Sequence, residues 1–422
     1  MLKFNLAKKI ILENINQLPA ETITLNENCL NTVIAENIIS SENIPNCDNS
    51  AMDGYAVKYS DIQKIPALLK VVGEVKAGDI FSKKLSAKGG SASGGKKLFG
   101  EAVKIMTGAP IPKGADVVVM VEDTEKQITN YKLQITDFVK ILKTVERGAN
   151  IRKAGEDIKN GEMILKKGMI LNPAQIGLLA SIGKIKIRTV KRPKVAIITT
   201  GDEIVDASVK KLPKGKVRNS NLWTITALLK RDGAIPIQLG TVPDNLSKTK
   251  SAIRKTISLS DAVIISAGIS VGEYDFVRVA LKQLGAKFII SQVAMKPGKP
   301  FAFSKIRSVP IFSLPGNPVS TMVTYEELVR PAILKMMGKQ STSLLVVKAI
   351  IQDDIYKKHG RKEFIRGVFT KKGGEYFVEL TGTQGSGILK SMSKANCFIV
   401  LDEKTLLVQK GSEVNIEILN KV

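Results

Sequence analysis

The feature that most constrains the fold is the alternation of short apolar segments with helical patterns in the second half of the chain. Four segments are continuous and rich in β-branched residues: 195–199, 235–239, 261–266 and 309–314. A helical pattern over 222–231 follows Asn219, Ser220 and Asn221, which can cap its first turn, and another runs from the fourth segment to about 337. Strands that are apolar on both faces and alternate with helices predict a three-layer α/β domain with a mostly parallel sheet.

The regions before and after this domain follow other patterns. Apolar side chains recur at helical spacing over 3–18, which predicts an amphipathic helix that ends near Pro19. Short β-rich runs separated by Gly and Pro over 68–121 predict a small β domain. After residue 342, five short runs predict a small C-terminal β-barrel or sandwich: 344–351, 364–369, 376–380, 397–401 and 414–418.

Length and composition agree with a multidomain α/β plus β protein. A chain of 422 residues is too long for one ordinary core and is expected to form two to four domains. No apolar run approaches the ~20 residues of a membrane span. The first twelve residues are interrupted by lysines and lack a small-residue cleavage site, so a cytoplasmic location is expected.

The formal net charge of +25 raises nucleic acid or an anionic membrane surface as partners. The lysines are dispersed among Ile and Asn, and aromatic residues that stack on bases make up only 5% of the chain. We therefore expect solvated surface charge and no specific nucleic-acid partner. Anionic small molecules remain compatible with this charge.

Cysteine and histidine usage restricts the possible metal chemistry. Cys29, Cys47 and Cys397 are widely spaced and form no Cys-x-x-Cys pair, which argues against a disulfide framework and a structural zinc site. His359 is the one histidine, so a histidine-rich metal centre is excluded.

Residues 86–97 consist mainly of Gly, Ser and Lys. Such a composition cannot bury a core, and it predicts a flexible linker, which is either a mobile loop or an insertion. We assign no catalytic role to it.

A polar loop is expected at 45–57, where turn formers surround Asp48, Asp53 and Tyr55. A surface turn with an Asx cap explains this composition about as well as a functional loop does. The remaining motifs of the chain favour the functional interpretation.

Three Gly-containing turns follow predicted strands, at 200–203, 268–275 and 315–318. In an open α/β sheet, ligands lie beyond the carboxyl ends of the strands. Glycines there allow backbone N–H groups to approach an oxyanion, and the N-terminus of a helix favours phosphate. Each turn alone is explained by ordinary strand-to-helix connection, but three at one edge favour a ligand site.

Lys296 and Lys299 lie in the sequence Lys-Pro-Gly-Lys-Pro. Two prolines and a glycine fix their backbone more than that of most lysines in the chain, which suits the binding of an oxyanion. Solvated surface charge is the alternative interpretation.

Several motifs occur in one order along nearly the whole chain, and this ordered set resembles the molybdopterin molybdenumtransferase family. That family catalyses the last step of molybdenum-cofactor synthesis and is related to the C-terminal region of gephyrin. The motifs are the loop at 45–57 and the segments 106–110, 152–157, 200–203, 266–275, 296–300 and 314–318. One departure is Ala267, which stands where many members have a second glycine.

The resemblance implies four regions. These are a discontinuous N-terminal domain of residues 1–45 and 142–180, an inserted β-rich lobe at 46–141, an α/β molybdopterin-binding domain at 181–338 and a C-terminal β domain at 339–422.

The resemblance also implies a Mg²⁺-dependent transferase that inserts molybdate into adenylylated molybdopterin and releases AMP. The implied catalytic residues are Asp48, Glu156, Asp202 and Asp275, and the last three of these are also the implied Mg²⁺ ligands. The implied substrate-binding residues are Asp53, Thr107, Gly201, Gly268, Ser270, Gly272, Pro315, Gly316 and Asn317. The implied molybdate-binding residues are Lys296, Lys299, Ser320, Arg361 and Ser386.

The implied assembly is a homodimer that receives its substrate from molybdopterin adenylyltransferase. That adenylyltransferase is itself an alternative identity, since it shares the α/β domain, but it lacks the flanking domains expected here. A scaffold or anionic-surface binder with a lapsed site is a second alternative. The intact carboxylates at Asp48, Glu156, Asp202 and Asp275 speak against it.

Overall fold

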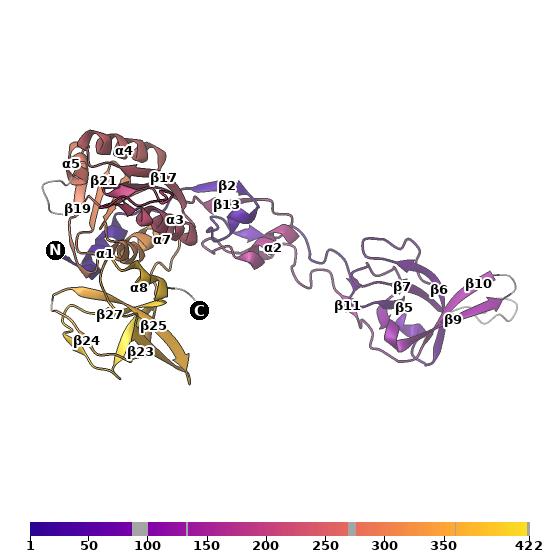
Figure 1. Cartoon of the computed structure of the whole chain (residues 1–422). Coiled ribbons are helices and arrows are strands. Elements are labelled where there is room, and N and C mark those ends of the chain that lie inside the picture. Colours follow the sequence, from indigo (N-terminus) through magenta and orange to yellow (C-terminus); the bar gives the residue numbers. More distant parts are fainter. Residues whose placement is uncertain (87–99, 132–133, 269–275, 359, 420–422) are drawn as a thin grey trace. The chain divides into compact units, whose positions relative to one another are not determined.

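The computed structural model describes residues 1–86, 100–131, 134–268, 276–358 and 360–419. The chain forms two compact units (Figure 1). The first unit consists of Met1–Glu36, Gly168–Pro173 and Lys186–Val422, and the second of Asn37–Lys167 and Ala174–Ile185. Each unit has its own hydrophobic core, so the expectation of a multidomain protein is confirmed. The boundaries of the four expected regions stay a prediction.

The first unit contains a six-stranded sheet with the order β17-β14-β18-β22-β21-β19. Its strands are β14 (Lys194–Thr200), β17 (Ile235–Val242), β18 (Ala262–Ser266), β19 (Lys287–Ile290), β21 (Ala302–Ile306) and β22 (Val309–Leu314). The first four strands in this order are parallel, and β21 and β19 add antiparallel pairings at one edge. The predicted mostly parallel sheet is confirmed.

Helices cover both faces of this sheet (Figure 1). Alternate residues of β14 point to opposite faces, so that Val195 and Ile197 join the core beneath α3 whereas Ile198 joins the core beneath α4 and α5. The helices are α3 (Ser220–Asp232), α4 (Leu246–Leu259), α5 (Phe276–Gln283), α6 (Pro318–Thr324) and α7 (Arg330–Met336), with a π-helical turn at Tyr325–Val329 between the last two. The predicted three layers are therefore present.

Two predicted helix boundaries can be compared with the structure. Asn219 caps α3 as predicted, because its side chain accepts a hydrogen bond from the Leu222 amide at 3.0 Å. The N-terminal helix α1 (Phe4–Glu13) ends earlier than the predicted 3–18, since the side-chain amide of Asn14 donates to the Ile10 carbonyl at 3.0 Å and closes the last turn.

The C-terminal region forms a barrel-like sheet, as predicted. Strands β25, β26, β23, β29 and β27 follow one another, and β27 pairs again with β25 to close the ring. The strands of this sheet are β1 (Leu2–Lys3), β20 (Val293–Lys296), β23 (Leu345–Ile351), β25 (Lys362–Lys372), β26 (Glu375–Leu380), β27 (Cys397–Leu401) and β29 (Glu413–Ile418). Three short elements accompany them: β24 (Ile355–Tyr356), β28 (Leu407–Val408) and α8 (Leu389–Lys394).

Strand β20 connects the α/β sheet to this barrel. It follows β19 in the chain but pairs in parallel with β25, so Lys296 lies opposite Glu363. The aromatic rings of Phe4 and Phe364 pack edge to face with centroids 5.0 Å apart. The main core of the first unit thus includes residues from α1, the α/β layers and the barrel. A separate two-stranded sheet pairs β2 (Ala20–Thr24) antiparallel with β13 (Lys186–Val190), which lies far along the chain.

The second unit is built around another six-stranded sheet, with the order β8-β5-β7-β6-β10-β9. Its strands are β5 (Gly54–Val57), β6 (Ala67–Val75), β7 (Gly100–Ile105), β8 (Val117–Met120), β9 (Thr124–Tyr131) and β10 (Gln134–Ile141). Shorter strands pair around it: β4 (Asn49–Ser50) with β11 (Ile151–Arg152) and β3 (Ile38–Ile39) with β12 (Met163–Leu165). Helix α2 (Pro173–Ser181) completes the elements. The predicted small β domain is confirmed.

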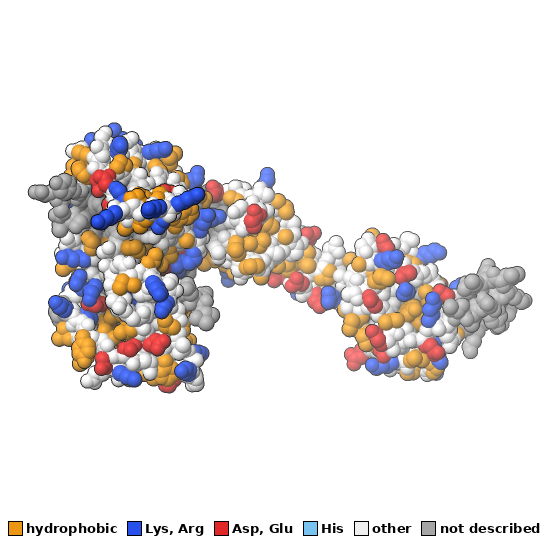
Figure 2. Space-filling view, viewed as in Figure 1, with side chains coloured by type: hydrophobic (Ala, Val, Ile, Leu, Met, Phe, Trp, Pro, Cys, Tyr) orange, Lys and Arg blue, Asp and Glu red, His pale blue; other side chains and the backbone are white. Residues whose placement is uncertain are grey.

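The charged side chains are distributed over the surface of each unit. On the face shown in Figure 2, Lys and Arg side chains are interspersed with Asp and Glu. Within the described part of the chain, no helix is long and apolar enough to cross a membrane.

Gly54 tests the packing of the second unit, since β5 and β8 approach closely there and a Cβ on Gly54 would overlap the carbonyl oxygen of Val119. We expect Gly54→Ala to destabilise β5 and β8 by ~3 kcal/mol, the upper end of the usual overpacking cost. Hydrogen exchange of the amides of both strands in the intact chain measures this loss. The control is Gly177→Ala in α2, where a Cβ meets open space and the helix gains ~0.5–1 kcal/mol. Unchanged exchange in Gly54→Ala would contradict this account of the packing.

Candidate functional site

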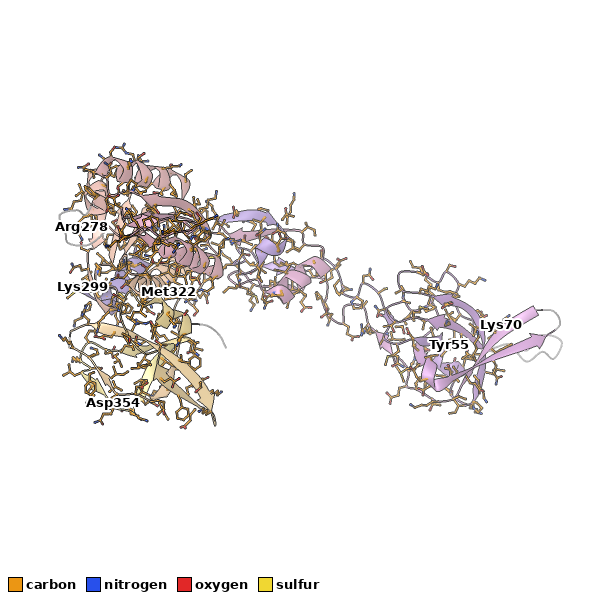
Figure 3. The ribbon with its side chains drawn as sticks, in the orientation of Figure 1. Tyr55, Lys70, Arg278, Lys299, Met322 and Asp354 are labelled. Carbon is orange, nitrogen blue, oxygen red and sulfur yellow. The ribbon has the colours of Figure 1, made fainter. Side chains whose placement is uncertain are left out.

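One cavity in the first unit gathers the side chains expected to bind an oxyanion. Its volume is about 540 Å³, and its walls come from the α/β domain and from the barrel. The lining includes all five residues implied for molybdate: Lys296, Lys299, Ser320, Arg361 and Ser386. Figure 3 labels Lys299 on the α/β side and Asp354 on the barrel side of this lining. Side chains that are up to 90 residues apart in the sequence therefore meet at one cavity.

Lys296 is held at the cavity by a buried carboxylate. Its Nζ lies 3.2 Å from Oε2 and 3.4 Å from Oε1 of Glu363, the residue opposite it in the pairing of β20 with β25. The Glu363 side chain is 7% exposed, whereas that of Lys296 is 50% exposed. The carboxylate of Glu363 thus holds the Lys296 ammonium group from one side, and the half-exposed side chain remains open to the cavity. No role was predicted for Glu363 from the sequence, although it stands two residues after Arg361.

The start of α6 holds the loop that carries Ser386. Asn317 precedes this helix but makes no capping hydrogen bond with its side chain. Its amide donates instead to the Ser386 hydroxyl at 3.1 Å, and the Val319 amide donates to the Ser386 carbonyl at 3.1 Å. Ser320 lies one residue further and is 4% exposed. The α/β domain and the barrel are therefore hydrogen-bonded directly beside the cavity.

The cavity has an excess of positive charge. Its lining contains the four cationic side chains Lys296, Lys299, Arg361 and Arg366 and the two acidic side chains Asp354 and Glu363, a surplus of two positive charges. Ammonium, guanidinium and hydroxyl groups together form a donor set for a tetrahedral oxyanion.

A second group of polar residues lies at the carboxyl ends of β14 and β17. Asp202 follows β14 and Asp244 follows β17. The backbone amide of each residue faces the side-chain carboxylate of the other. The Asp244 amide donates to Oδ1 of Asp202 at 3.1 Å, and the Asp202 amide lies 3.4 Å from Oδ2 of Asp244. Each carboxylate keeps one oxygen to which no described residue donates. The sequence predicts a role for Asp202 but none for Asp244, although Asp244 also follows a strand end.

The glycine turns at this edge are closely packed. A Cβ on Gly268 would lie 2.5 Å from Cγ2 of Val277, and one on Gly316 would lie 3.1 Å from the Cβ of Ala267. Ala267 itself has a φ of 77°, in the left-handed region that favours glycine. Gly201 has a φ of 139°. Pro315, which precedes Gly316, also lines the cavity.

Asn221 links two of these turns. Its amide donates to the Ser266 hydroxyl at 2.9 Å and to the Gly316 carbonyl at 2.7 Å. Its Oδ1 and the Thr200 hydroxyl are buried and have no hydrogen-bond partner among the described residues. The sequence predicted only a helix-capping role for this region. Two buried polar atoms, one at the end of β14 and one in the first turn of α3, therefore have no described partner.

The second unit holds the other expected site residues. The Asp48 carboxylate accepts hydrogen bonds from the Lys153 ammonium at 2.8 Å and from the Ala154 amide at 2.9 Å, and these bonds lower the pKa of Asp48. Glu156 accepts from the Lys153 amide at 3.0 Å. These contacts join the polar loop at 45–57 to the segment 152–157.

Asp53 is bound to Thr107 in the same unit. Oδ1 of Asp53 accepts from the Thr107 amide at 2.7 Å and from the Thr107 hydroxyl at 3.0 Å. Both hydrogen bonds, first that of the amide and then that of the hydroxyl, lower the pKa of Asp53. Two of the expected substrate-binding residues are therefore direct partners.

Some expected residues lie outside the described part of the chain. These are Ser270, Gly272 and Asp275, together with residues 87–97 of the Gly/Ser/Lys segment. Among the described residues, no group of three or more His, Cys, Asp or Glu side chains is arranged to hold a metal ion. The predicted set Glu156, Asp202 and Asp275 stays a prediction.

Three family models match successive parts of the chain. The MoeA N-terminal region (domain I and II) matches residues 2–183, a probable molybdopterin binding domain matches 196–335, and the MoeA C-terminal region (domain IV) matches 348–419. Together they cover most of both units.

Full-length relatives and solved structures agree with these matches. A molybdopterin molybdenumtransferase of Haemophilus influenzae is 38% identical and covers 100% of this chain and 99% of that protein. One from Staphylococcus aureus is 32% identical, over 97% of this chain and 94% of that protein. Crystal structures of a molybdopterin biosynthesis moeA protein from Pyrococcus horikoshii give TM-scores of 0.77 at 27% identity and 0.73 at 30% identity, and cover at least 99% of this chain and 100% of theirs.

The fold and these matches define a multidomain transferase of molybdenum-cofactor biosynthesis. The chain belongs to the molybdopterin molybdenumtransferase family.

The contact between Asp53 and Thr107 generates a prediction about pKa. Thr107→Val removes the hydroxyl donor and keeps the amide, so we expect the pKa of Asp53 to rise but to stay below its ordinary value. A carboxyl group with a lowered pKa stabilises the fold above its ordinary pKa, and this contribution is lost as the pH falls through the lowered value. NMR titration of the Asp53 carboxyl carbon measures the change.

Thr124→Val is the matched control, because the Thr124 hydroxyl donates to the Val121 carbonyl and contacts no carboxylate. An unchanged Asp53 titration in Thr107→Val would show that the hydroxyl does not act on this carboxylate.

Proposed function

We propose that this transferase inserts molybdate into adenylylated molybdopterin, with Mg²⁺, and releases AMP. The observation that carries the proposal is the single cavity that gathers Lys296, Lys299, Ser320, Arg361 and Ser386 and has a surplus of positive charge. A tetrahedral dianion matches this donor set in charge and in hydrogen-bonding capacity.

In this mechanism the side chains of the cavity position the oxyanion. Lys296, Lys299 and Arg361 neutralise its charge, and the hydroxyls of Ser320 and Ser386 donate hydrogen bonds to its remaining oxygens. No covalent intermediate with the protein is required, because holding both reactants and neutralising their charge supplies the acceleration.

The adenylate is proposed to bind at the carboxyl ends of the parallel strands. Backbone N–H groups at Gly268 and Gly316 approach its phosphates, whereas the Gly201 amide donates to the Val242 carbonyl at 3.4 Å and contributes through the shape of its turn. The buried Thr200 hydroxyl and Asn221 carbonyl oxygen have no protein partner among the described residues. Hydrolysis of the phosphoanhydride there releases AMP and frees the pterin phosphate.

The residues at this edge fit a Mg²⁺ ion in their donor chemistry. Mg²⁺ takes hard oxygen ligands, and it is commonly bound by one or two carboxylates together with substrate phosphates. Asp202 and Asp244 each have a carboxylate oxygen that receives no hydrogen bond from the described residues, and they would hold the ion. When bound, Mg²⁺ supplies neutralisation of phosphate charge.

The proposal further includes a homodimer, a cytoplasmic location and molybdopterin adenylyltransferase as the donor of the substrate. Asp48, Asp53, Thr107 and Glu156 are proposed to act on the adenylylated substrate. Their support is that hydrogen bonds link the loop at 45–57 to two other motifs: Asp53 accepts from Thr107, and Asp48 accepts from Ala154 in the motif that contains Glu156.

The direct test is incubation of the purified chain with adenylylated molybdopterin, Mg²⁺ and molybdate. We expect AMP to be released and the product to activate an apo-molybdoenzyme. Release of neither product would contradict the proposal and would favour a scaffold role.

Asp202 tests the adenylate half of the site. Asp202→Asn removes a charge with little change of shape, and we expect AMP release to fall at least about tenfold while molybdate binding is unchanged. The matched control is Asp206→Asn, an exposed carboxylate four residues away whose partner is the Ser208 amide. Wild-type AMP release in Asp202→Asn would remove this residue from the mechanism.

Arg361 tests the molybdate half. We expect Arg361→Ala to raise the molybdate concentration for half-maximal transfer about tenfold, the effect of one lost charge-assisted hydrogen bond, and to leave binding of the pterin adenylate unchanged. Arg254→Ala on α4, outside the cavity lining, is the control. Equal weakening of both ligands by Arg361→Ala would mean that Arg361 supports the whole site and not the oxyanion alone.

A further inference from the structure

Two cations of the C-terminal barrel are buried without a carboxylate partner. Lys357 is 8% exposed and Arg366 is 1% exposed. Within the described residues neither forms an ion pair, in contrast to Lys296, which is paired with Glu363. Burying an unpaired charge is costly. Of the two cations, Arg366 lines the cavity, and Lys357 binds the backbone of Arg361, which also lines it.

Lys357 holds the segment that carries Arg361. Its Nζ donates to the Arg361 carbonyl at 3.1 Å, to the Glu403 carbonyl at 3.4 Å and more weakly to the Lys358 carbonyl at 3.5 Å. The ammonium group therefore joins the backbone at Arg361 to the loop that follows β27.

Arg366 holds the segment that carries Ser386. Its Nη2 donates to the Thr383 carbonyl at 3.3 Å and the Gly385 carbonyl at 3.2 Å, and its Nε donates to the Ser391 hydroxyl at 2.8 Å. Its backbone is tied to the same segment, because the Arg366 amide donates to Oε1 of Gln384 at 3.0 Å. One guanidinium thus fixes both ends of the loop on which Ser386 lies.

Arg366 also lines the cavity itself. No described residue accepts a hydrogen bond from its Nη1. Burial lowers the pKa of Arg366, as expected for a cation whose partners are neutral. Its positive charge is therefore not cancelled by the protein.

We propose that Lys357 and Arg366 are positioning residues for oxyanion capture, which hold Arg361 and Ser386 in place and leave their own charge uncompensated until the dianion binds. This inference rests on the proposed function, since it requires that the cavity takes a tetrahedral dianion. Carbonyl groups orient the two cations but carry no net charge, so the charge of Arg366 acts directly on the cavity that it lines, whereas Lys357 acts through the backbone of Arg361.

Calorimetric titration of the full chain with molybdate tests the proposal. We expect Arg366→Gln and Lys357→Met each to weaken binding about tenfold or more, because each removes a charge and releases a loop. Arg366→Lys restores the charge but not the two-carbonyl geometry, so its affinity should lie between those of the wild type and Arg366→Gln.

The controls are two cations that also donate to backbone carbonyls, but to carbonyls of residues that do not line the cavity. Arg192 donates to the Gly233 carbonyl at 2.6 Å and Lys339 to the Asp232 carbonyl at 3.3 Å. We expect Arg192→Gln and Lys339→Met to bind molybdate as the wild type does.

Thermal unfolding with and without molybdate gives a second readout for variants of lowered stability. A ligand that binds the folded state raises Tm according to its affinity, so the molybdate-induced shift should shrink in Arg366→Gln and Lys357→Met and persist in both controls.

The outcomes separate the two claims. If Arg361→Ala weakens molybdate binding but Arg366→Gln and Lys357→Met do not, the positioning role is wrong and the proposed function stands. Equal weakening by the Arg192 and Lys339 variants would also overturn the positioning role. If the wild-type chain binds no molybdate, the proposed function fails and the inference fails with it.

Discussion

The parallel pairing of β20 with β25 is the constraint on which the rest of the site depends. β20 leaves the α/β sheet and adds to the barrel, so one short strand fixes the distance between the two parts of the first unit. The same pairing places Lys296 opposite the buried carboxylate of Glu363 and brings it to the wall that also carries Arg361. The oxyanion-binding side chains can therefore be rigid, although they come from separate layers.

Rigidity matters because charge neutralisation requires fixed donors. A lysine on a free loop keeps its rotamer entropy and its hydration, whereas a lysine held by a buried carboxylate has already lost part of both. The hydrogen bonds from Asn317 and Val319 to Ser386 act in the same way from the other side of the cavity. The edge-to-face packing of Phe4 on Phe364 adds apolar contact behind this wall.

Much of the fold could be predicted from the sequence because its signals are local. The apolar strands, the Asn219 cap and the five C-terminal strand segments each follow from short-range patterns. The antiparallel pairings of β21 and β19 could not be predicted in this way, since pairing depends on which strands meet in space. The early end of α1 at Glu13 depends on a side-chain contact of Asn14 that apolar spacing does not record.

In the candidate site, too, the features that depend on local sequence were predicted and those that depend on long-range contacts were not. Lys296 and Lys299 were found through the prolines and glycine around them, and Asp202 through its place after a strand. Glu363 and Asp244 stand at positions that a local pattern marks, two residues after Arg361 and directly after a strand, but their partners lie more than 40 residues away, and no local pattern identifies those partners. The sequence predicts a capping role for Asn221, whereas in the structure its amide links Ser266 to Gly316 across two turns.

The central claim is that a surplus of two positive charges selects a tetrahedral dianion. The most direct measurement compares the affinities of molybdate and perrhenate by calorimetry at one pH and ionic strength, because the two ions share a tetrahedral shape but carry two charges and one charge. The account predicts that perrhenate binds at least about tenfold more weakly than molybdate, since charge-assisted contacts to it are weaker. Equal affinity for the two ions would show that shape alone is recognised and would contradict the account.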